Sequence, residues 1–397
     1  MNEKKSAARY AYVILFLVCL GIFIPDFSQY QISGFGAQLT ESMGLTSSQF
    51  AQIATAPLIP GIFLSLVVGI IVDRFGARRP LTVAMVISGA AIVWRLFARS
   101  YAEIYISMIC MGVCATFLNA NNAKILSQWF SPARAGIMVG FYLGAANAAN
   151  ALGQGTTAFF PSVQSAFRFS AVLAVVGIVL FVIFMRDHDS TQKEIEHVSV
   201  LEGLKVCSRN RYIWIIALCL MLDVSAYSSL AHFLPQALAT RGIPQTTAPL
   251  ISMGLSLGGL ASCFIGPALI TRARNTRLVI TCCAAAAALG VAFAWRASMS
   301  PVVLFILVFL TGFLSTSFTP VITALPVRLE KIGTKYAGTA GGMIATVQLA
   351  GIVILPTYVI SPIVGSNFKL MFLIFGALDV ILCVVVQFLP KLGRTDN

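Results

Sequence analysis

Two segments of the chain repeat the pattern D-x-S-x-Y, Asp26-Phe27-Ser28-Gln29-Tyr30 and Asp223-Val224-Ser225-Ala226-Tyr227. Each lies inside a long apolar stretch, where an ionisable residue is costly and is a candidate functional group. The tyrosine follows its aspartate by four residues, so both side chains share one helical face. Such a carboxyl group can take up and release a proton, and we predict that both Asp-Tyr pairs carry proton coupling. The alternative is that the aspartates serve helix packing or pair with a buried cation.

A second set of polar residues could hold a substrate. Side-chain amides facing lipid would lack partners, so those in apolar stretches must face protein or a wet cavity. They could bind substrate or join helices, and they are Asn119, Asn122, Asn147, Asn150, Gln154 and Gln348. Two cations, Lys124 and Arg95, could bind an anion, although both are placed to snorkel to a membrane surface.

Two further titratable residues have weaker claims to a functional role. Asp379 has no counterpart in the repeat, and we predict a structural role for it. His232 could relay a proton, but its place after the second pattern favours a surface end.

The elements that position these residues are apolar blocks. The chain of 397 residues is 58% hydrophobic and 10% charged, whereas soluble domains carry roughly 25% charged residues. A helix needs ~20 apolar residues to cross a bilayer, and continuous runs argue against a membrane barrel. We predict an all-α membrane protein with twelve transmembrane helices, at about 11–33, 47–71, 81–98, 102–127, 136–160, 169–185, 212–235, 248–270, 278–295, 302–326, 338–361 and 368–389.

The net charge of +13 is explained by topology. Most of the 27 Lys and Arg fall in the segments that are inside if both termini are cytoplasmic. This is the positive-inside bias, so we predict a multi-pass protein of the cell (inner or plasma) membrane with both ends in the cytoplasm and no nucleic-acid partner. None of the nine cysteines falls in a predicted outer loop, so no disulfide is expected. No metal or cofactor motif is found, and cofactors are not expected.

The chain divides into two halves. A segment of mixed charge at 187–211 separates six predicted spans within 1–186 from six within 212–397. The offset of the D-x-S-x-Y repeat also brings Gly69 onto Gly266, each before a basic turn. This agreement indicates an internal duplication.

The loop after the second span reads Gly69-x-x-x-Asp73-Arg74-x-Gly76-x-Arg78-Arg79 and resembles the signature loop of the major facilitator superfamily. The resemblance implies two pseudo-symmetric six-helix bundles around a central cavity, which transport by alternating access. From the residues alone, Asp73 could cap a helix start or pair with Arg134, and the loop could be an anchor only. The resemblance implies instead a latch that holds the inner gate closed. The gating residues are then Gly69, Asp73, Arg74, Gly76, Arg78, Arg79 and Arg134.

These features favour a proton-coupled symporter for a small polar solute, most simply an organic anion such as a monocarboxylate or sugar acid. The segment 122–134 resembles the end of the fourth span in organic-anion and cyanate-type symporters. No proline follows Gly136-x-x-x-Gly140, unlike drug antiporters of the family. The spans 47–71 and 248–270 contain no arginine, unlike its nitrate and nitrite porters.

Several alternatives to symport remain. They are an efflux antiporter for amphipathic compounds, a uniporter or anion exchanger, and a ligand sensor. An enzyme is not expected, because no nucleophile–base pair or phosphate loop is present. The resemblance implies a monomer.

Overall fold

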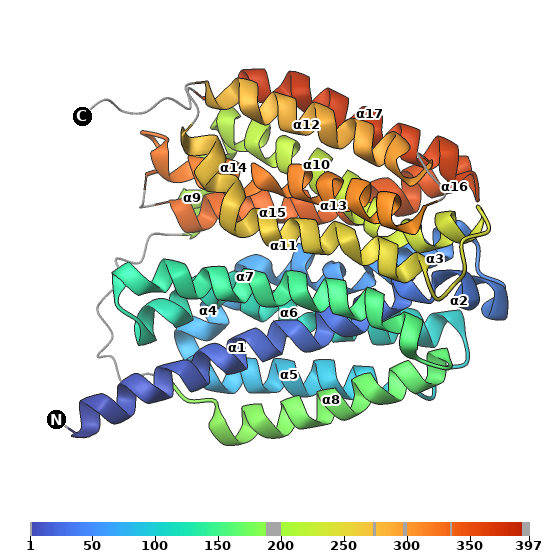
Figure 1. Cartoon of the computed structure of the whole chain (residues 1–397). Coiled ribbons are helices and arrows are strands. Elements are labelled where there is room, and N and C mark those ends of the chain that lie inside the picture. Colours follow the sequence, from blue (N-terminus) through green and yellow to red (C-terminus); the bar gives the residue numbers. More distant parts are fainter. Residues whose placement is uncertain (1, 188–199, 273–274, 297–299, 334–335, 391–397) are drawn as a thin grey trace.

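The computed structural model describes residues 2–187, 200–272, 275–296, 300–333 and 336–390, and every element in them is helical (Figure 1). The first half contains α1 Asn2–Gly34, α2 Gly36–Met43, α3 Ser47–Thr55, η1 Ala56–Leu58, α4 Ile59–Phe75, α5 Arg78–Trp94, α6 Tyr101–Trp129, α7 Pro132–Gly155, η2 Thr156–Phe159 and α8 Val163–Phe184. The second half contains α9 Val200–Ser208, α10 Arg211–Ala239, α11 Ala248–Arg272, α12 Thr276–Phe293, η3 Ala294–Arg296, α13 Pro301–Ser317, α14 Thr319–Thr323, η4 Leu325–Arg328, α15 Ala337–Ile354, η5 Leu355–Ile360, α16 Ser361–Val364, α17 Phe368–Val385 and η6 Val386–Phe388.

Most of the long helices overlap the predicted spans, although α1 begins at Asn2 rather than at 11 and α13 ends at Ser317 rather than at 326. Within the described residues, ten helical segments are long and apolar enough to cross a membrane. The two other predicted spans correspond to α3, η1 and α4 in sequence, and to the 17-residue helix α5. Pro57, in the short 3-10 turn η1, separates α3 from α4, because proline cannot donate a hydrogen bond within a helix. Most of the predicted linker, residues 188–199, lies outside the described residues.

The helices pack in two groups that follow the order of the chain. In the first half, α1 contacts α6, α7 and α8, and α5 contacts α6 and α8. In the second, α10 contacts α15 and α17, and α11 contacts α13. Figure 1 shows the two groups one above the other, with α7 against α11 and α4 against α15 between them. Helix α1 begins and α17 ends at the same end of the molecule, which we call the termini end.

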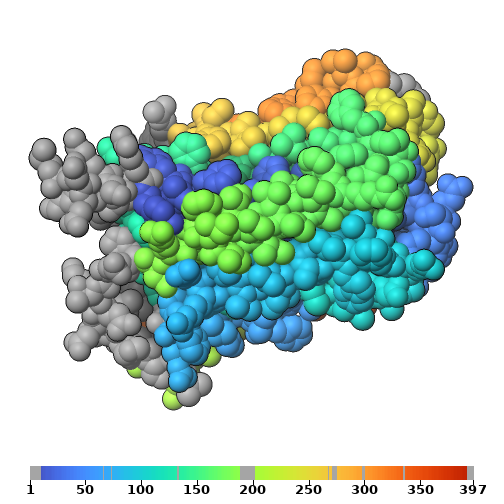
Figure 2. All heavy atoms as spheres, turned by 90° about the horizontal axis from the view of Figure 1, so that it is seen from below, coloured from blue at the N-terminus to red at the C-terminus, as the bar shows by residue number. Residues whose placement is uncertain are grey.

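The outer surface of the helices is apolar. Side chains such as Val172, Val176, Val179 and Ile183 of α8 are exposed, as are Val83 and Ile87 of α5. Figure 2 shows part of this face, where α5 and α8 lie side by side. A surface of this kind suits the hydrocarbon core of a bilayer, since the helices satisfy their own backbone groups.

Close helix approach near the centre depends on glycine. A Cβ atom at Gly153 of α7 would overlap the carbonyl of Phe27, the residue after Asp26 on α1. In the second half, a Cβ at Gly258 would overlap the Phe309 carbonyl, and one at Gly312 would overlap the Leu255 carbonyl. Small residues at such points let membrane helices touch along their backbones. The α1–α7 contact therefore fixes the position of the first D-x-S-x-Y segment.

Candidate functional site between α1 and α10

The first Asp-Tyr face lies on α1, which continues as a helix through Pro25. Asp26 is partly exposed and interacts electrostatically with Tyr30 on its own helix. It also interacts with Tyr142, a fully buried residue of α7. The Tyr142 hydroxyl donates a hydrogen bond to Oδ1 of Asn119 at 2.6 Å. Asn119 is thus joined to the Asp26 region through a tyrosine that the sequence analysis did not select.

The second Asp-Tyr face lies on α10, and its aspartate is almost fully buried. Asp223 is 2% exposed, and its Oδ2 accepts a hydrogen bond from Oγ1 of Thr319 at 3.2 Å. Tyr227, one turn further along, lies beside Ser256 of α11. Neither hydroxyl has a well-formed hydrogen bond within the described chain. Two buried hydroxyl groups are therefore available to a bound molecule.

The side-chain amide of Asn147 completes this polar cluster, next to Gly259 of α11. A Cβ atom placed on Gly259 would lie 3.2 Å from both Oδ1 of Asn147 and the Tyr227 hydroxyl. Asn147 donates to the Leu143 carbonyl at 3.1 Å and to Sγ of Cys263 at 3.5 Å. Its side chain therefore reaches from the first half into the second, and glycine at 259 leaves the space between the polar groups open.

The two faces meet through their tyrosines. Tyr30 and Tyr227 lie near each other although they come from different halves. The Tyr30 ring also packs on the ring of His232, with centroids 5.1 Å apart. Nδ1 of His232 shares a hydrogen bond of 2.6 Å with Oγ of Ser33 on α1. The expected surface position of His232 is wrong, because its side chain is only 2% exposed in the contact between the halves.

The other predicted substrate residues are spread more widely. Gln154 donates to the Ala231 carbonyl at 2.7 Å, which joins α7 to α10. Oδ1 of Asn150 is buried without a partner among the described residues. Asn122 bonds to its own helix at the Leu118 and Asn119 carbonyls. Lys124 on α6 and Gln348 on α15 are partly buried.

Arg95 does not snorkel, contrary to the alternative raised for it. Its side chain is 1% exposed and donates to the carbonyl of Ser28 at 2.9 Å and to its hydroxyl at 2.7 Å. The guanidinium also lies over the Phe167 ring, 4.0 Å from its centroid. Arg95 therefore connects α5, α1 and α8 inside the first half.

The signature loop is held by an acid that the sequence analysis did not choose. Asp187 follows α8, and its Oδ1 accepts hydrogen bonds from the backbone N–H groups of Ala77 and Arg78 at 2.6 and 2.8 Å. Gly76 has a φ of 76° and lies against this carboxylate. The side chain of Asp73 is outside the described part of the structure. The arginine side chains of this gating set are exposed, at Arg74, Arg78, Arg79 and Arg134.

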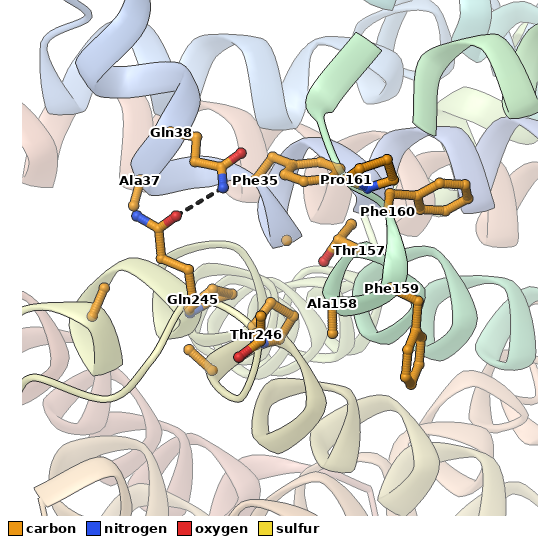
Figure 3. A pocket seen from close by; sticks show the side chains of 15 residues that line it. Phe35, Ala37, Gln38, Thr157, Ala158, Phe159, Phe160, Pro161, Gln245 and Thr246 are labelled. Atoms are coloured by element: carbon orange, nitrogen blue, oxygen red, sulfur yellow. Dashed lines mark hydrogen bonds between the residues drawn. The ribbon is translucent and has the colours of Figure 1, made fainter. Parts of the chain in front are cut away.

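The end opposite the termini is tied across the two halves. Nε2 of Gln38 donates to Oε1 of Gln245 at 2.8 Å, at the edge of a pocket of about 420 Å³ (Figure 3). Phe35 and Thr157 line the same pocket. Nearby, Oγ of Ser48 donates to the Thr357 carbonyl at 2.9 Å. We call this the tied end.

Towards the termini end, several glycines on facing helices have open space. A Cβ atom would meet no described atom within 4 Å at Gly69 of α4, Gly136 and Gly140 of α7, or Gly338 of α15. The same helices are in close contact nearer the tied end, where a Cβ at Gly61 would overlap Leu349 and one at Gly155 would overlap Met253. The two halves therefore pack more tightly at the tied end.

The comparisons with known proteins agree with this architecture. Residues 11–356 match the sequence profile described as Major Facilitator Superfamily. The chain belongs to this superfamily. It is a membrane transporter rather than an enzyme. Among the described residues, no group of three His, Cys, Asp or Glu side chains could hold a metal ion.

Curated relatives within the superfamily are distant. A protein described as a probable sulfoacetate transporter, SauU of Cupriavidus necator, is 25% identical over 441 residues, covering 99% of this chain and 97% of its own. The nitrite extrusion protein of Bacillus subtilis is 24% identical over 214 residues, which is 52% of each chain. The probable nitrate/nitrite transporter NarK2 of Mycobacterium tuberculosis is 24% identical over 259 residues, 64% of this chain and 65% of its own. The chain thus spans about half to two thirds of two of these relatives.

Solved structures share the fold at low identity. A mutant of the nucleoside transporter NupG gives a TM-score of 0.77 at 13% identity, covering 96% of this chain and 100% of the other. A bacterial homologue of the human lysosomal transporter Spinster, in its inward-facing and occupied conformation, gives 0.74 at 11% identity, covering 96% of each. These likenesses establish the superfamily fold.

Proposed function

We propose that the protein is a proton-coupled symporter for a small organic anion, such as a monocarboxylate or sugar acid. Two six-helix bundles, residues 1–186 and 212–397 joined by 187–211, would alternate access to a central site. The chain would act as a monomer in the cell membrane, with both termini in the cytoplasm. The signature loop and Arg134 would form the latch at the termini end.

The observation that carries proton coupling is the meeting of the two Asp-Tyr faces. Asp26 and Tyr30 come from one half, Asp223 and Tyr227 from the other, and the tyrosines lie near each other across the contact. A carboxyl group in a low-dielectric site strongly prefers its neutral form unless a cation compensates it. Proton uptake at these aspartates would therefore depend on whether water reaches them from one end of the protein or the other.

The anionic substrate is supported by the donors around Gly259 and by the full-length relative. Tyr227, Ser256 and Asn147 offer hydroxyl and amide groups to a carboxylate or sulfonate. Asn150, Asn119 and Asn122 extend the polar lining along α7 and α6, and Gln348 and Lys124 would complete it. The name of the sulfoacetate relative, an organic anion transporter, agrees with this substrate class.

The test is transport by the purified protein in liposomes that contain a pH-sensitive dye. We expect one class of small organic anions to drive proton influx together with solute uptake. Asp26→Asn and Asp223→Asn should each abolish proton influx, because each removes a group that binds and releases the proton. Binding measured by calorimetry on the same variants would show that the proteins are folded and still recognise the solute.

Different results would support the rival functions. Solute uptake without a proton signal, unchanged in both variants, would contradict symport and indicate a uniporter or anion exchanger. Proton influx coupled to the exit of amphipathic compounds would indicate an efflux antiporter instead.

A further inference from the structure

A second buried acid lies close to Asp223 in the second half. Asp379 on α17 is 1% exposed, and α17 packs directly against α10. Asp223 is twelve residues from the start of α10, about 18 Å along the helix, and Asp379 is ten residues before Leu389, about 15 Å from the same end. The two acids are therefore at nearly the same depth on neighbouring helices, and their carboxyl groups interact electrostatically.

The two carboxyl groups have few hydrogen-bond partners. Oδ2 of Asp223 accepts the bond from Thr319. Oδ1 of Asp223 and both oxygens of Asp379 are buried without a partner within the described residues. Buried carboxylate oxygens are expected to be paired, so three such oxygens at one place need an explanation.

Among the described residues, no basic side chain forms an ion pair or a hydrogen bond with either carboxyl group. The titratable neighbours are the thiols of Cys219 on α10 and Cys383 on α17, with Tyr227 further along α10. Helix α12 adds Cys282 beside Cys383, and its basic residue, Arg277, donates to the Leu389 carbonyl at the helix end. Helix α15, which packs on α10, carries no ionisable residue over Ala337–Ile354.

We propose that Asp223 and Asp379 form a carboxyl pair that shares a proton, so that Asp379 is a second proton-binding residue of the second half. Two negative charges side by side in a low-dielectric interior, without a cation, cannot both persist. One proton between them removes this repulsion and turns one carboxyl group into a hydrogen-bond donor for an oxygen of the other. The geometry thus assigns Asp379 a chemical role in place of the structural role predicted from the sequence.

The pair deepens the proposed coupling and depends on it for any role in transport, whereas the shared proton is a property of the folded chain. A proton taken up at Asp223 would pass to Asp379 and back by movement between neighbouring oxygens. No covalent bond other than O–H is broken or formed. Asp379 would thereby set the proton concentration at which Asp223 is loaded.

The direct test is infrared spectroscopy of the protein in lipid nanodiscs, titrated over pH. The neutral carboxyl C=O band lies apart from that of the carboxylate, so the two forms can be counted. We expect wild type to keep a neutral carboxyl band at pH 7. Asp223→Asn and Asp379→Asn should each change the intensity of this band. The sum of the two changes should differ from the change in the double variant, since each residue titrates differently without the other. Asp379→Glu should restore the band, and Glu41→Gln, a change at an exposed acid of α2, should leave it unchanged.

Other spectra would overturn the pair. Additive changes in the single variants would show that the acids titrate independently. A band that moves with sodium concentration at fixed pH would show that a monovalent cation occupies the site in place of the proton.

Transport adds a separate readout in liposomes. Asp379→Asn should shift the proton concentration for half-maximal flux by at least about tenfold, which is one pH unit. If wild type shows no proton flux at all, the proposed function fails, yet the infrared titration still decides whether the proton is shared.

Discussion

At the level of single residues, the serine of the repeated pattern has a different environment in each half. Ser28 accepts hydrogen bonds from Arg95 through its carbonyl and its hydroxyl. The hydroxyl of Ser225, its counterpart, is buried without a partner among the described residues. The two copies of the pattern are therefore alike in sequence, but within the described residues the arginine contact is found in the first copy. Arg95 accordingly has two competing explanations, a substrate-binding cation and a bond that holds the first half together.

We expect Arg95→Lys to lower stability by about 2 kcal/mol, because an ammonium cannot reproduce the forked contact with Ser28. The same change should leave the KM for solute within about twofold, since the guanidinium is enclosed by α1, α5 and α8. The measurements are thermal unfolding in detergent and uptake kinetics. Lys124→Gln provides a matched comparison, as it changes a predicted substrate cation outside this contact. A large rise in KM with unchanged unfolding would instead make Arg95 a substrate residue.

At the level of elements, the start of α5 depends on an acid more than a hundred residues away. The first N–H groups of a helix lack partners within it and carry partial positive charge. Asp187 supplies the acceptor for two such groups, at Ala77 and Arg78. The bond ties the end of α8 to the signature loop. Movement of this loop during gating would therefore also displace the start of the linker at Asp187.

Gly76→Ala should destabilise this junction more than Gly69→Ala. Gly76 has φ 76° and ψ 174°, a region that costs other residues about 1–3 kcal/mol, and its new methyl group would press on the Asp187 carboxylate. At Gly69 a methyl group meets open space, so any loss there should be below about 0.5 kcal/mol. Thermal unfolding of both variants, with Asp187→Ala alongside, checks the comparison. Equal effects at the two glycines would contradict this account of the loop.

Sequence patterns predicted local features well and contacts between distant segments poorly. The apolar blocks located most of the long helices, because helix formation and burial in lipid depend on neighbouring positions in the sequence. The four-residue spacing placed Asp26 with Tyr30 and Asp223 with Tyr227. The sequence did not predict the hydrogen bonds between Asp187 and the signature loop or between Ser33 and His232. Both depend on how separate helices pack, and no spacing along the chain records that arrangement.

For the whole molecule, the two ends differ in how the halves are joined. The tied end holds the Ser33–His232 and Gln38–Gln245 hydrogen bonds, whereas glycines such as Gly136 and Gly338 face open space towards the termini end. A transporter of this superfamily must break the contacts between the halves at the tied end before solute can enter or leave there. The stability of a few polar contacts at that end then sets the balance between the two conformations.

Ser33→Ala tests this balance. Loss of one buried hydrogen bond costs about 1 kcal/mol. This loss would raise the ratio of molecules with the tied end open to those with it closed by about fivefold. The reporter is a Gln38→Cys, Gln245→Cys pair joined by a short bis-thiol reagent, because two facing glutamines span more than a disulfide can. We expect cross-linking to slow in Ser33→Ala, by at most about fivefold, because its rate follows the fraction of molecules with the tied end closed. Ser42→Ala, whose hydroxyl bonds the Leu39 carbonyl of its own helix, should leave the rate unchanged.

The cross-linked protein should also lose solute transport while it still binds solute from the termini end, since only one of the two openings is blocked. The single-cysteine variants show what the nine native thiols contribute to the reaction with the reagent. If Ser33→Ala and Ser42→Ala cross-link at the same rate, the Ser33–His232 bond has no part in closure, and the balance rests on apolar packing such as Phe50 against Phe233. If transport continues after complete cross-linking, the tied end is not a gate, and the solute path must run elsewhere through the molecule.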